Sequence, residues 1–295
     1  MLLRAGDRTL DLRAPVLMGI VNATPDSFSD AGELRDLDAR VARAAALAAA
    51  GAGIVDVGGE SGVTNRPPVA AEEEIARVVP LIERIVAEVG VPVSVDTYKP
   101  AVAAASVAAG ACMVNDVSGL RDPELAAVCA RTGAALVLMH TRAAPKVKVL
   151  DPALYDGAGG VAADVAGFLA ERMALAATHG VGEEQIVLDP GPDFAKTPAQ
   201  TVAALRGLAE LRALGRPILL AISRKDFIGA VTGRGPRDRL AGTLAALGWG
   251  VEAGAQLFRV HDVEAAADFL AVRAVLRGEA EVAAEAALAE ELRRV

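Results

Sequence analysis

Aromatic residues and cysteines are scarce in this chain of 295 residues. Aromatic side chains make up 3% of the residues and there are two cysteines, whereas hydrophobic residues in total reach 53%. The core must therefore be built mainly from small and branched aliphatic side chains. Cys112 and Cys129 both lie in apolar stretches, which predicts buried thiols in a reducing compartment rather than a disulfide framework.

Long apolar runs and an excess of positive charge are also missing. No uninterrupted hydrophobic stretch approaches the ~20 residues of a membrane-spanning helix. Near the N-terminus, Arg4, Asp7 and Arg8 interrupt the apolar region that a secretory signal would need. The formal net charge of −8 argues against nucleic acid as the main partner, because such proteins carry a basic surface. We therefore expect a cytoplasmic protein that binds neither membranes nor nucleic acid.

Short aliphatic segments alternate with longer, Ala-rich amphipathic segments along the chain. The short segments are apolar almost throughout and are bounded by Gly, Pro or polar residues, which is typical of parallel strands buried on both faces. A glycine follows each amphipathic segment, as the C-terminal ends of helices favour. The predicted strands are Val16–Val21, Ile54–Val57, Val93–Asp96, Met113–Val117, Ala135–Met139, Gln185–Leu188, Ile218–Ile222 and Gln256–Val260.

The repeat of strand and helix predicts the architecture. Eight such repeats in fewer than 300 residues predict a single-domain (β/α)8 TIM barrel of the α/β class. An open doubly wound sheet is the alternative, but no G-x-G-x-x-G motif follows any predicted strand. We expect the barrel to span residues 16–278, with an N-terminal cap or hairpin over 1–15 and a helical extension over 279–295.

Polar residues follow almost every predicted strand at its C-terminal end, where barrel enzymes place their catalytic groups. An unpaired polar group buried there costs a few kcal/mol, so eight such clusters predict a functional site. Asp56 and Asp116 are each compatible with a simpler function, bonding neighbouring backbone and Ser or Thr groups. For His140 a core position and a position in the site are about equally compatible with the sequence.

Four of these strand-end residues suit a planar heterocycle. Asp96 and Asp189 can accept from amino and ring N–H groups, while Asn115 and Lys225 can donate to ring nitrogen and carbonyl groups. This set favours a pterin-like or purine-like ring. Lys225 as a Schiff-base nucleophile is the alternative, but two carboxylates at the same mouth would keep its amine charged. The sequence offers no set of three His or Cys ligands for zinc.

Other strand-end residues predict an anion site. Arg259 and His261 flank the start of the last barrel helix, where barrels commonly bind phosphate. Thr64 and Arg66 add donors in the loop after the second strand, and Asn22 offers an oxygen to Mg²⁺, which prefers few protein ligands together with phosphate. Since diphosphate is a leaving group, the residues predict a transferase in which a carboxylate stabilises the cation that remains.

These motifs together make the sequence resemble the dihydropteroate synthase family from about Val16 to Leu276. Seven motifs occur in order, each at a predicted strand end. They are N-x-T-P-D-S-F-S-D (Asn22–Asp30), Gly58–Ser61, S-V-D-T-Y-K (Ser94–Lys99), N-D-V-S-G (Asn115–Gly119), Leu188–Gly191 with Phe194 and Lys196, Ser223–Lys225 with Phe227–Gly229, and R-V-H-D-V (Arg259–Val263).

The resemblance implies a reaction and a set of site residues. It implies a barrel that condenses 6-hydroxymethyl-7,8-dihydropterin diphosphate with 4-aminobenzoate, giving 7,8-dihydropteroate and diphosphate in folate biosynthesis. It also implies a homodimer, Mg²⁺ as the cofactor and sensitivity to sulfonamides. Asp96, Asp189 and Lys225 would be catalytic, and Asn22 would bind the metal. Substrate would be bound by Thr64, Arg66, Asp96, Asn115, Asp189, Phe194, Lys225, Arg259 and His261.

Three departures from the family pattern lie on the aminobenzoate side. The loop after the second strand carries Gly62, Val63 and Asn65 as apparent extra residues. Asp226 follows Lys225 where the family usually has a Ser that is thought to meet the aminobenzoate carboxylate, and Pro192-Asp193 replaces an aliphatic residue and Gly.

The departures leave alternatives open. One is an inactive paralogue, or one that uses a different amine, which still binds the pterin diphosphate. Another is a pterin-binding methyltransferase module that works with a corrinoid partner. A methyl-pterin carries no diphosphate, so such a module would not need the motifs at Ser223–Lys225 and Arg259–His261. The sequence therefore favours the synthase.

Overall fold

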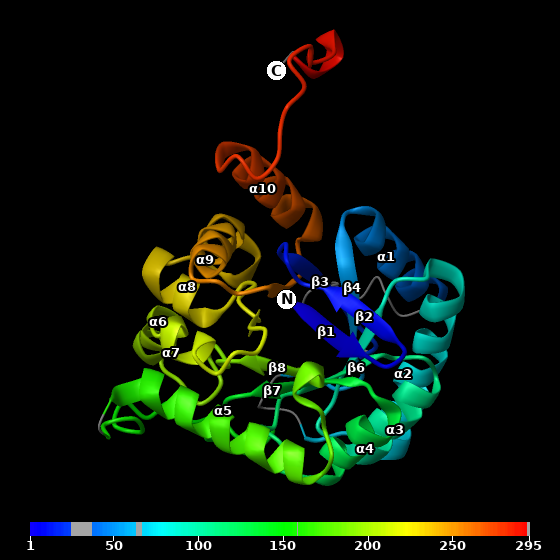
Figure 1. Ribbon diagram of the computed structural model, residues 1–295, viewed down its shortest axis with the longest axis vertical. Helices are drawn as coiled ribbons and strands as arrows, with labels where there is room; N and C mark the ends of the chain where they lie inside the picture. Colours follow the sequence, from blue (N-terminus) through cyan, green and yellow to red (C-terminus); the bar gives the residue numbers. More distant parts are fainter. Residues whose placement is uncertain (25–36, 63–66, 158, 294–295) are drawn as a thin grey trace.

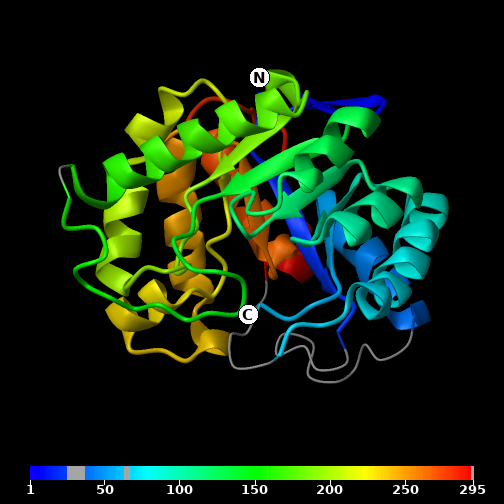
Figure 2. The same cartoon turned by 90° about the horizontal axis from the view of Figure 1, so that it is seen from below.

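The strands of this protein close into a barrel surrounded by helices. The computed structural model describes residues 1–24, 37–62, 67–157 and 159–293. Within these ranges, eight parallel strands form one sheet in the order β8-β7-β6-β5-β4-β3-β10-β9, and a parallel bridge between Leu188 and Ile218 joins its two edges. The helices lie outside the strands (Figures 1 and 2). The predicted TIM barrel is confirmed.

The strands are buried on both faces, as expected for a parallel barrel. In the strand Ala135–Met139, for example, every residue is buried. Neighbouring strands pair in parallel, with one shift of register between Leu17 and Met18, so the C-terminal ends of the strands meet at one mouth. The barrel strands are β3 (Val16–Asn22), β4 (Ala52–Gly58), β5 (Val93–Asp96), β6 (Met113–Asp116), β7 (Ala135–Met139), β8 (Ile186–Asp189), β9 (Leu219–Leu220) and β10 (Leu257–Val260).

The helices return the chain from the mouth to the opposite end of the barrel. Gly90 and Gly133, each at the C-terminal end of a helical segment, have φ of 74°, which non-glycine residues rarely adopt. Gly207 separates two short consecutive helices, Pro198–Arg206 and Leu208–Arg212. The helices are α1 (Leu37–Ala49), α2 (Ala71–Arg84), α3 (Pro100–Ala108), α4 (Glu124–Thr132), α5 (Gly160–Thr178), α6 (Pro198–Arg206), α7 (Leu208–Arg212), α8 (Asp226–Thr232), α9 (Leu240–Glu252) and α10 (Val263–Leu276), with a π-helical segment over Ile85–Val89.

An antiparallel hairpin covers the N-terminal end of the barrel. It consists of β1 (Leu2–Ala5) and β2 (Arg8–Asp11). Leu3 and Leu12 are buried in the same apolar cluster as the barrel residue Met18. This packing closes the bottom of the barrel, so the opposite end, where the strands finish, is left for a binding site.

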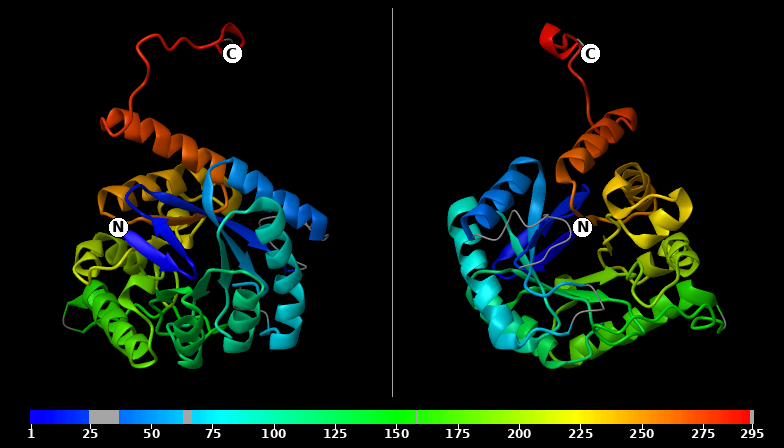
Figure 3. Two further views of the ribbon diagram at one scale, coloured as in Figure 1. Left: turned by 45° about the vertical axis from the view of Figure 1, so that its right-hand side comes forward. Right: turned by 180° about the vertical axis from the view of Figure 1, so that it is seen from behind.

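The helix predicted over 279–295 is wrong for the part of that segment that the structure describes. Residues 279–293 contain one short 3₁₀ turn, Glu290–Leu292, and are exposed throughout. Both views in Figure 3 show this segment extending away from the barrel. An isolated helix of about 15 residues is marginal in water unless an apolar face packs against the protein, and here there is no such packing. In the described ranges, no helix combines the length and the apolar character needed to cross a membrane.

Candidate active site

The C-terminal ends of the strands open into a cavity of about 630 Å³. Eight of the ten residues singled out from the sequence line it. Thr64 and Arg66 lie outside the described residues. The lining residues include Asn22, Asp96, Asn115, Asp189, Phe194, Lys225, Arg259 and His261.

Arg259, on β10, joins the carboxylates of two neighbouring strands. Its Nε donates to Asp56 Oδ2 at 2.6 Å and its Nη2 donates to Asp96 Oδ2 at 2.8 Å. Asn115 Nδ2 also donates to Asp56 Oδ2, at 3.2 Å. Asp56 is fully buried, so it fixes both the arginine and the asparagine rather than bonding local backbone.

The simpler interpretation holds for Asp116. Its two carboxylate oxygens accept the backbone N–H groups of Ser118 at 2.8 Å and Leu120 at 2.5 Å. These bonds shape the turn that follows β6, since Asp commonly bonds backbone two to four residues on. Asp116 is therefore structural, although it stands beside Asn115 in the sequence.

Two carboxyl groups at the mouth titrate close to neutral pH. Burial raises the pKa of Asp96 to about 7; Arg259 opposes this rise and Asp56 adds to it. Burial raises the pKa of Asp189 to about 6, while the Gly191 N–H bond at 2.7 Å lowers it. Removal of water disfavours the charged form of each carboxyl, so both can accept a proton or a hydrogen bond from a ligand near neutral pH.

Lys225 also lines the cavity, just before α8. Its Nζ is 4.6 Å from the centroid of the Phe194 ring, a cation–π distance. Burial lowers the pKa of Lys225, and the carboxylates of Asp193 and Asp189 oppose that shift. The nearby carboxylates therefore favour a charged, hydrogen-bonding amine over the neutral nucleophile of a Schiff base.

His261 is held in place by the loop after β9. Its ring Nδ1 lies 2.9 Å from Ser223 Oγ, which also accepts the His261 backbone N–H at 3.2 Å. Burial lowers the pKa of His261 to about 3, and the positive charges of Arg259 and Arg224 add to this effect. The imidazole is therefore neutral at physiological pH, and it offers an anion a hydrogen bond rather than a charge.

The residues near Lys225 that depart from the family pattern contact one another. The Asp226 N–H donates to Asp193 Oδ2 at 2.5 Å, and the Asp226 carboxylate pairs with Arg239 at 3.0 Å. Arg239 is buried and also donates to the carbonyl oxygens of Arg224 and Lys225. Arg224 itself pairs with Asp262. Asp226 is thus neutralised by Arg239, a residue that the sequence analysis did not single out.

The stem of the divergent loop after β4 is held by ion pairs. Glu60 accepts from Lys99 Nζ at 2.6 Å and from the Val69 N–H at 2.9 Å. Lys99 also pairs with the buried Glu74. These contacts fix both ends of the segment that contains the extra residues.

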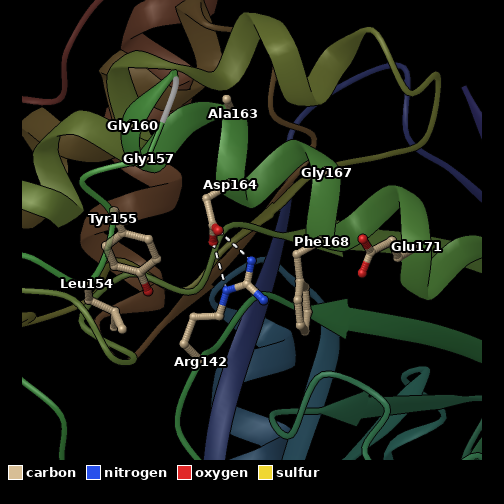
Figure 4. A pocket seen from close by; sticks show the side chains of 10 residues that line it. All are labelled: Arg142, Leu154, Tyr155, Gly157, Gly160, Ala163, Asp164, Gly167, Phe168 and Glu171. Carbon is tan, nitrogen blue, oxygen red and sulfur yellow. Dashed lines mark hydrogen bonds and ion pairs between the residues drawn. The ribbon is translucent and has the colours of Figure 1, made fainter.

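His140 does not line the mouth, although the sequence left this open. It is fully buried, with Nε2 at 2.8 Å from Asp164 Oδ2 and Nδ1 at 2.7 Å from Lys196 Nζ. Asp164 and its partner Arg142 line another cavity, of about 350 Å³, outside the barrel beside α5 (Figure 4). Lys196 was named from the sequence only as part of the motif that begins at Leu188–Gly191, and this lysine was assigned no role.

The fold and the cavity define a class of protein: a barrel enzyme with a mixed donor and acceptor site for a planar ligand at the C-terminal ends of its strands. The family model for pterin binding enzymes matches residues 18–261. Curated relatives include dihydropteroate synthase of Bacillus subtilis (strain 168), which is 43% identical over 250 residues and 84% of each chain. That of Escherichia coli (strain K12) is 39% identical over 264 residues, 90% of this chain and 92% of the relative.

Solved structures agree with these relatives. Dihydropteroate synthase of Xanthomonas albilineans with 4-aminobenzoic acid is 42% identical, with a TM-score of 0.84 over 94% of this chain and 99% of that chain. The Yersinia pestis enzyme with a sulfonamide drug is 35% identical, with a TM-score of 0.87 over 95% and 100%. This chain therefore belongs to the pterin binding enzymes and, within them, to the dihydropteroate synthases, transferases of folate biosynthesis. The resemblance found in the sequence is confirmed.

Proposed function

We propose that this chain condenses 6-hydroxymethyl-7,8-dihydropterin diphosphate with 4-aminobenzoate, releasing 7,8-dihydropteroate and diphosphate. The observation that carries the proposal is the convergence of Asp96, Asn115, Asp189 and Lys225 on one cavity. We place the reaction in the cytoplasm, where the buried free thiols of the chain stay reduced. A solved Xanthomonas albilineans relative holds 7,8-dihydropteroate, which supports the assignment of the product.

The pterin ring would lie between the carboxylates and the amine. Asp189 and Asp96 would accept from the amino and ring N–H groups, while Asn115 and Lys225 would donate to ring nitrogen and oxygen. Phe194, which stacks beneath Lys225, would bound one face of the space. Because Arg259 holds Asp56 and Asp96 in fixed positions, the site needs little rearrangement to receive the ring.

The reaction separates into bond breaking and bond making. The carbon–oxygen bond to diphosphate breaks first, and its electron pair leaves with the diphosphate. The amine of 4-aminobenzoate then attacks the resulting pterin-methyl cation, forms the carbon–nitrogen bond and releases one proton. Asp96 is the carboxylate placed to stabilise the cation, because a fixed negative charge in a water-poor site favours developing positive charge.

We propose that Mg²⁺ binds through Asn22 together with the diphosphate of the substrate. Among the described residues there is no cluster of three His, Cys, Asp or Glu side chains that could hold a metal. Mg²⁺ commonly uses one or two protein oxygens plus substrate phosphates, so the amide oxygen at the end of β3 fits this requirement. The metal would neutralise charge on the diphosphate leaving group. Ser223, Arg259 and His261 would position that diphosphate.

We propose that the enzyme works as a homodimer through the outer faces of α9 and α10. Trp249 is 53% exposed, Val272 61% and Leu276 81%. Exposed large apolar side chains on two neighbouring helices are typical of an interface. Light scattering after size exclusion tests this: a dimer is expected, and Trp249→Asp should yield a monomer.

A single-turnover assay tests the proposed reaction. Enzyme in excess is mixed with pterin diphosphate, 4-aminobenzoate and Mg²⁺, and dihydropteroate and diphosphate are followed separately. Both products are expected, and Asn22→Ala should raise the Mg²⁺ concentration needed for half-maximal rate. Diphosphate without dihydropteroate would mean that a different amine is the acceptor. Neither product, with pterin still bound, would identify an inactive paralogue.

A further inference from the structure

A buried lysine lies directly behind the pterin-binding wall of the cavity. Lys196, on the loop between β8 and α6, is 1% exposed. Its Nζ lies 2.7 Å from His140 Nδ1, 3.0 Å from the Gly191 oxygen and 3.1 Å from the Phe194 oxygen. The His140 carbonyl oxygen lies 3.4 Å from the same Nζ, so four acceptors surround an ammonium group that has three N–H donors. Each donor therefore has a partner within the fold.

The His140 ring is oriented to serve as one of these acceptors. Its Nε2 is 2.8 Å from the Asp164 carboxylate, so Nε2 carries the proton and Nδ1 presents its lone pair to Lys196. Burial lowers the pKa of His140 to about 4, which keeps the ring neutral. Arg142 fixes the same carboxylate from the outer cavity (Figure 4).

The two carbonyl groups that Lys196 holds belong to the segment that forms the site. The N–H of Gly191 donates to Asp189 Oδ1 at 2.7 Å, and the ring of Phe194 supports the Lys225 amine. Gly191 has φ of 64°, and a Cβ there would lie 2.1 Å from the His140 oxygen. The backbone at Gly191 thus passes very close to His140. Lys196 Nζ bonds to both residues of this contact, to the Gly191 oxygen and to His140 Nδ1.

We propose that Lys196 is a positioning residue of the pterin subsite: its buried amine fixes the segment from Asp189 to Phe194 through the Gly191 and Phe194 oxygens. This inference rests on the proposed function. A neutral side chain of similar size would be cheaper to bury than a cation. The charge is instead matched by nearby carboxylates, of which Asp189 and Asp193 line the cavity.

The charged groups around the pair support this function. Asp189 is faced by Lys196, Lys225 and Arg259, all of which lower its pKa. Burial lowers the pKa of Lys196 to about 7; Asp189, Asp164 and Asp193 oppose this, and Lys225 adds to it. Each partner therefore favours the charged form of the other, and removal of the lysine must raise the pKa of Asp189.

The pH dependence of kcat/KM for the pterin diphosphate tests the proposal. Lys196→Met removes the charge at similar length, Lys196→Arg keeps it, and Arg131→Met on the outer face of α4 is the control for loss of a surface cation. In Lys196→Met the acid limb should move up by about 0.5–1 pH unit, and KM for the pterin should rise about tenfold or more. KM for 4-aminobenzoate should change less than about threefold, and Lys196→Arg should keep the wild-type limb.

Other outcomes would overturn the proposal. An unshifted acid limb in Lys196→Met, or an equal loss toward both substrates together with a lower melting temperature, would mean that Lys196 only stabilises the fold. If Lys196→Met does not fold, Lys196→Gln, which is neutral but still donates to a carbonyl, should show the same shift. If the wild-type enzyme lacks turnover with 4-aminobenzoate, the proposed reaction fails. The pH dependence of pterin diphosphate binding, measured by calorimetry in wild type and Lys196→Met, then still tests the function of Lys196.

Discussion

Asp193 accepts the backbone N–H of Asp226 at 2.5 Å, and this bond fastens the loop after β8 to the start of α8. Asp193 has φ of 66°, and its other oxygen accepts from Thr201 Oγ1 at 3.1 Å. Since a non-glycine residue holds such a backbone only when its surroundings demand it, these bonds matter to the site. Asp193 and Asp226, which both depart from the family pattern, are therefore joined in one structural unit.

Asp193→Asn should improve the use of 4-aminobenzoate. Asn tolerates the positive φ and can still accept the Asp226 N–H, so the substitution removes only the charge. Loss of one negative charge near an anionic acceptor changes the interaction by about 1 kcal/mol, so KM for 4-aminobenzoate should fall about 3- to 10-fold. Steady-state kinetics with 4-aminobenzamide provide the neutral control, whose KM should not change. Equal changes for both amines would contradict this explanation.

Asp96→Ala should abolish turnover while leaving the fold intact. The Asp96 side chain is 21% exposed in the cavity, and Arg259 keeps its bond to Asp56 without it. We expect kcat to fall at least about 100-fold, with a melting temperature close to that of wild type. Asp56→Ala is the matched contrast: it leaves a buried arginine less well paired, so it should cost about 3 kcal/mol of stability. A near-normal kcat in Asp96→Ala would exclude the proposed stabilisation of the cation.

Asp96→Asn should also change how stability depends on pH. The pKa of Asp96 in the fold is about 7, above its ordinary value of 3.8. The folded protein therefore binds a proton that the unfolded chain releases, and stability falls as pH rises through that interval. Asp96→Asn cannot ionise and so does not lose stability in this way. The melting temperature of the variant minus that of wild type should therefore be larger at pH 8 than at pH 5. Parallel pH curves for the two proteins would refute the shift.

Arg239→Met should weaken both stability and catalysis. The guanidinium donates to the carbonyl oxygens of Arg234, Arg224 and Lys225 and to the Asp226 carboxylate. Without it, these part-buried carbonyl groups lose a partner and the Lys225 loop loses its support, at up to about 1–3 kcal/mol for each group that water does not reach. We expect a lower melting temperature and a fall in kcat/KM of about tenfold or more. Arg239→Lys should rescue little, because an ammonium cannot span the same acceptors.

Removal of residues 281–295 should leave the enzyme unchanged. The described part of this segment is exposed and contains one 3₁₀ turn, whereas Glu279, which pairs with Arg273, is retained. The truncated chain should keep the same kcat and the same total helical signal in circular dichroism. A loss of helical signal would show that the tail is helical in solution, and a loss of activity would show that it contributes to the site.

The sequence was sufficient for the barrel and for most of the mouth. Short, continuous apolar segments predict each strand, because a strand buried on both faces must be apolar almost throughout. Polar residues at the ends of such strands usually face the mouth of the barrel, so Asp96, Asn115, Asp189 and Arg259 could be predicted from the sequence, although Asp116 bonds the turn after β6 instead. The order of the strands then brings these side chains together.

Contacts between distant segments were decided by tertiary structure alone. Nothing local links Asp193 to Asp226 or Lys196 to His140, because each pair meets only after the barrel has closed. The same holds for Arg239, whose carbonyl partners at Arg224 and Lys225 lie in another loop and carry no sequence signal. The tail shows the converse: residues 279–293 have the composition of a helix, but helix stability in water depends mainly on packing, and the fold provides no surface for it.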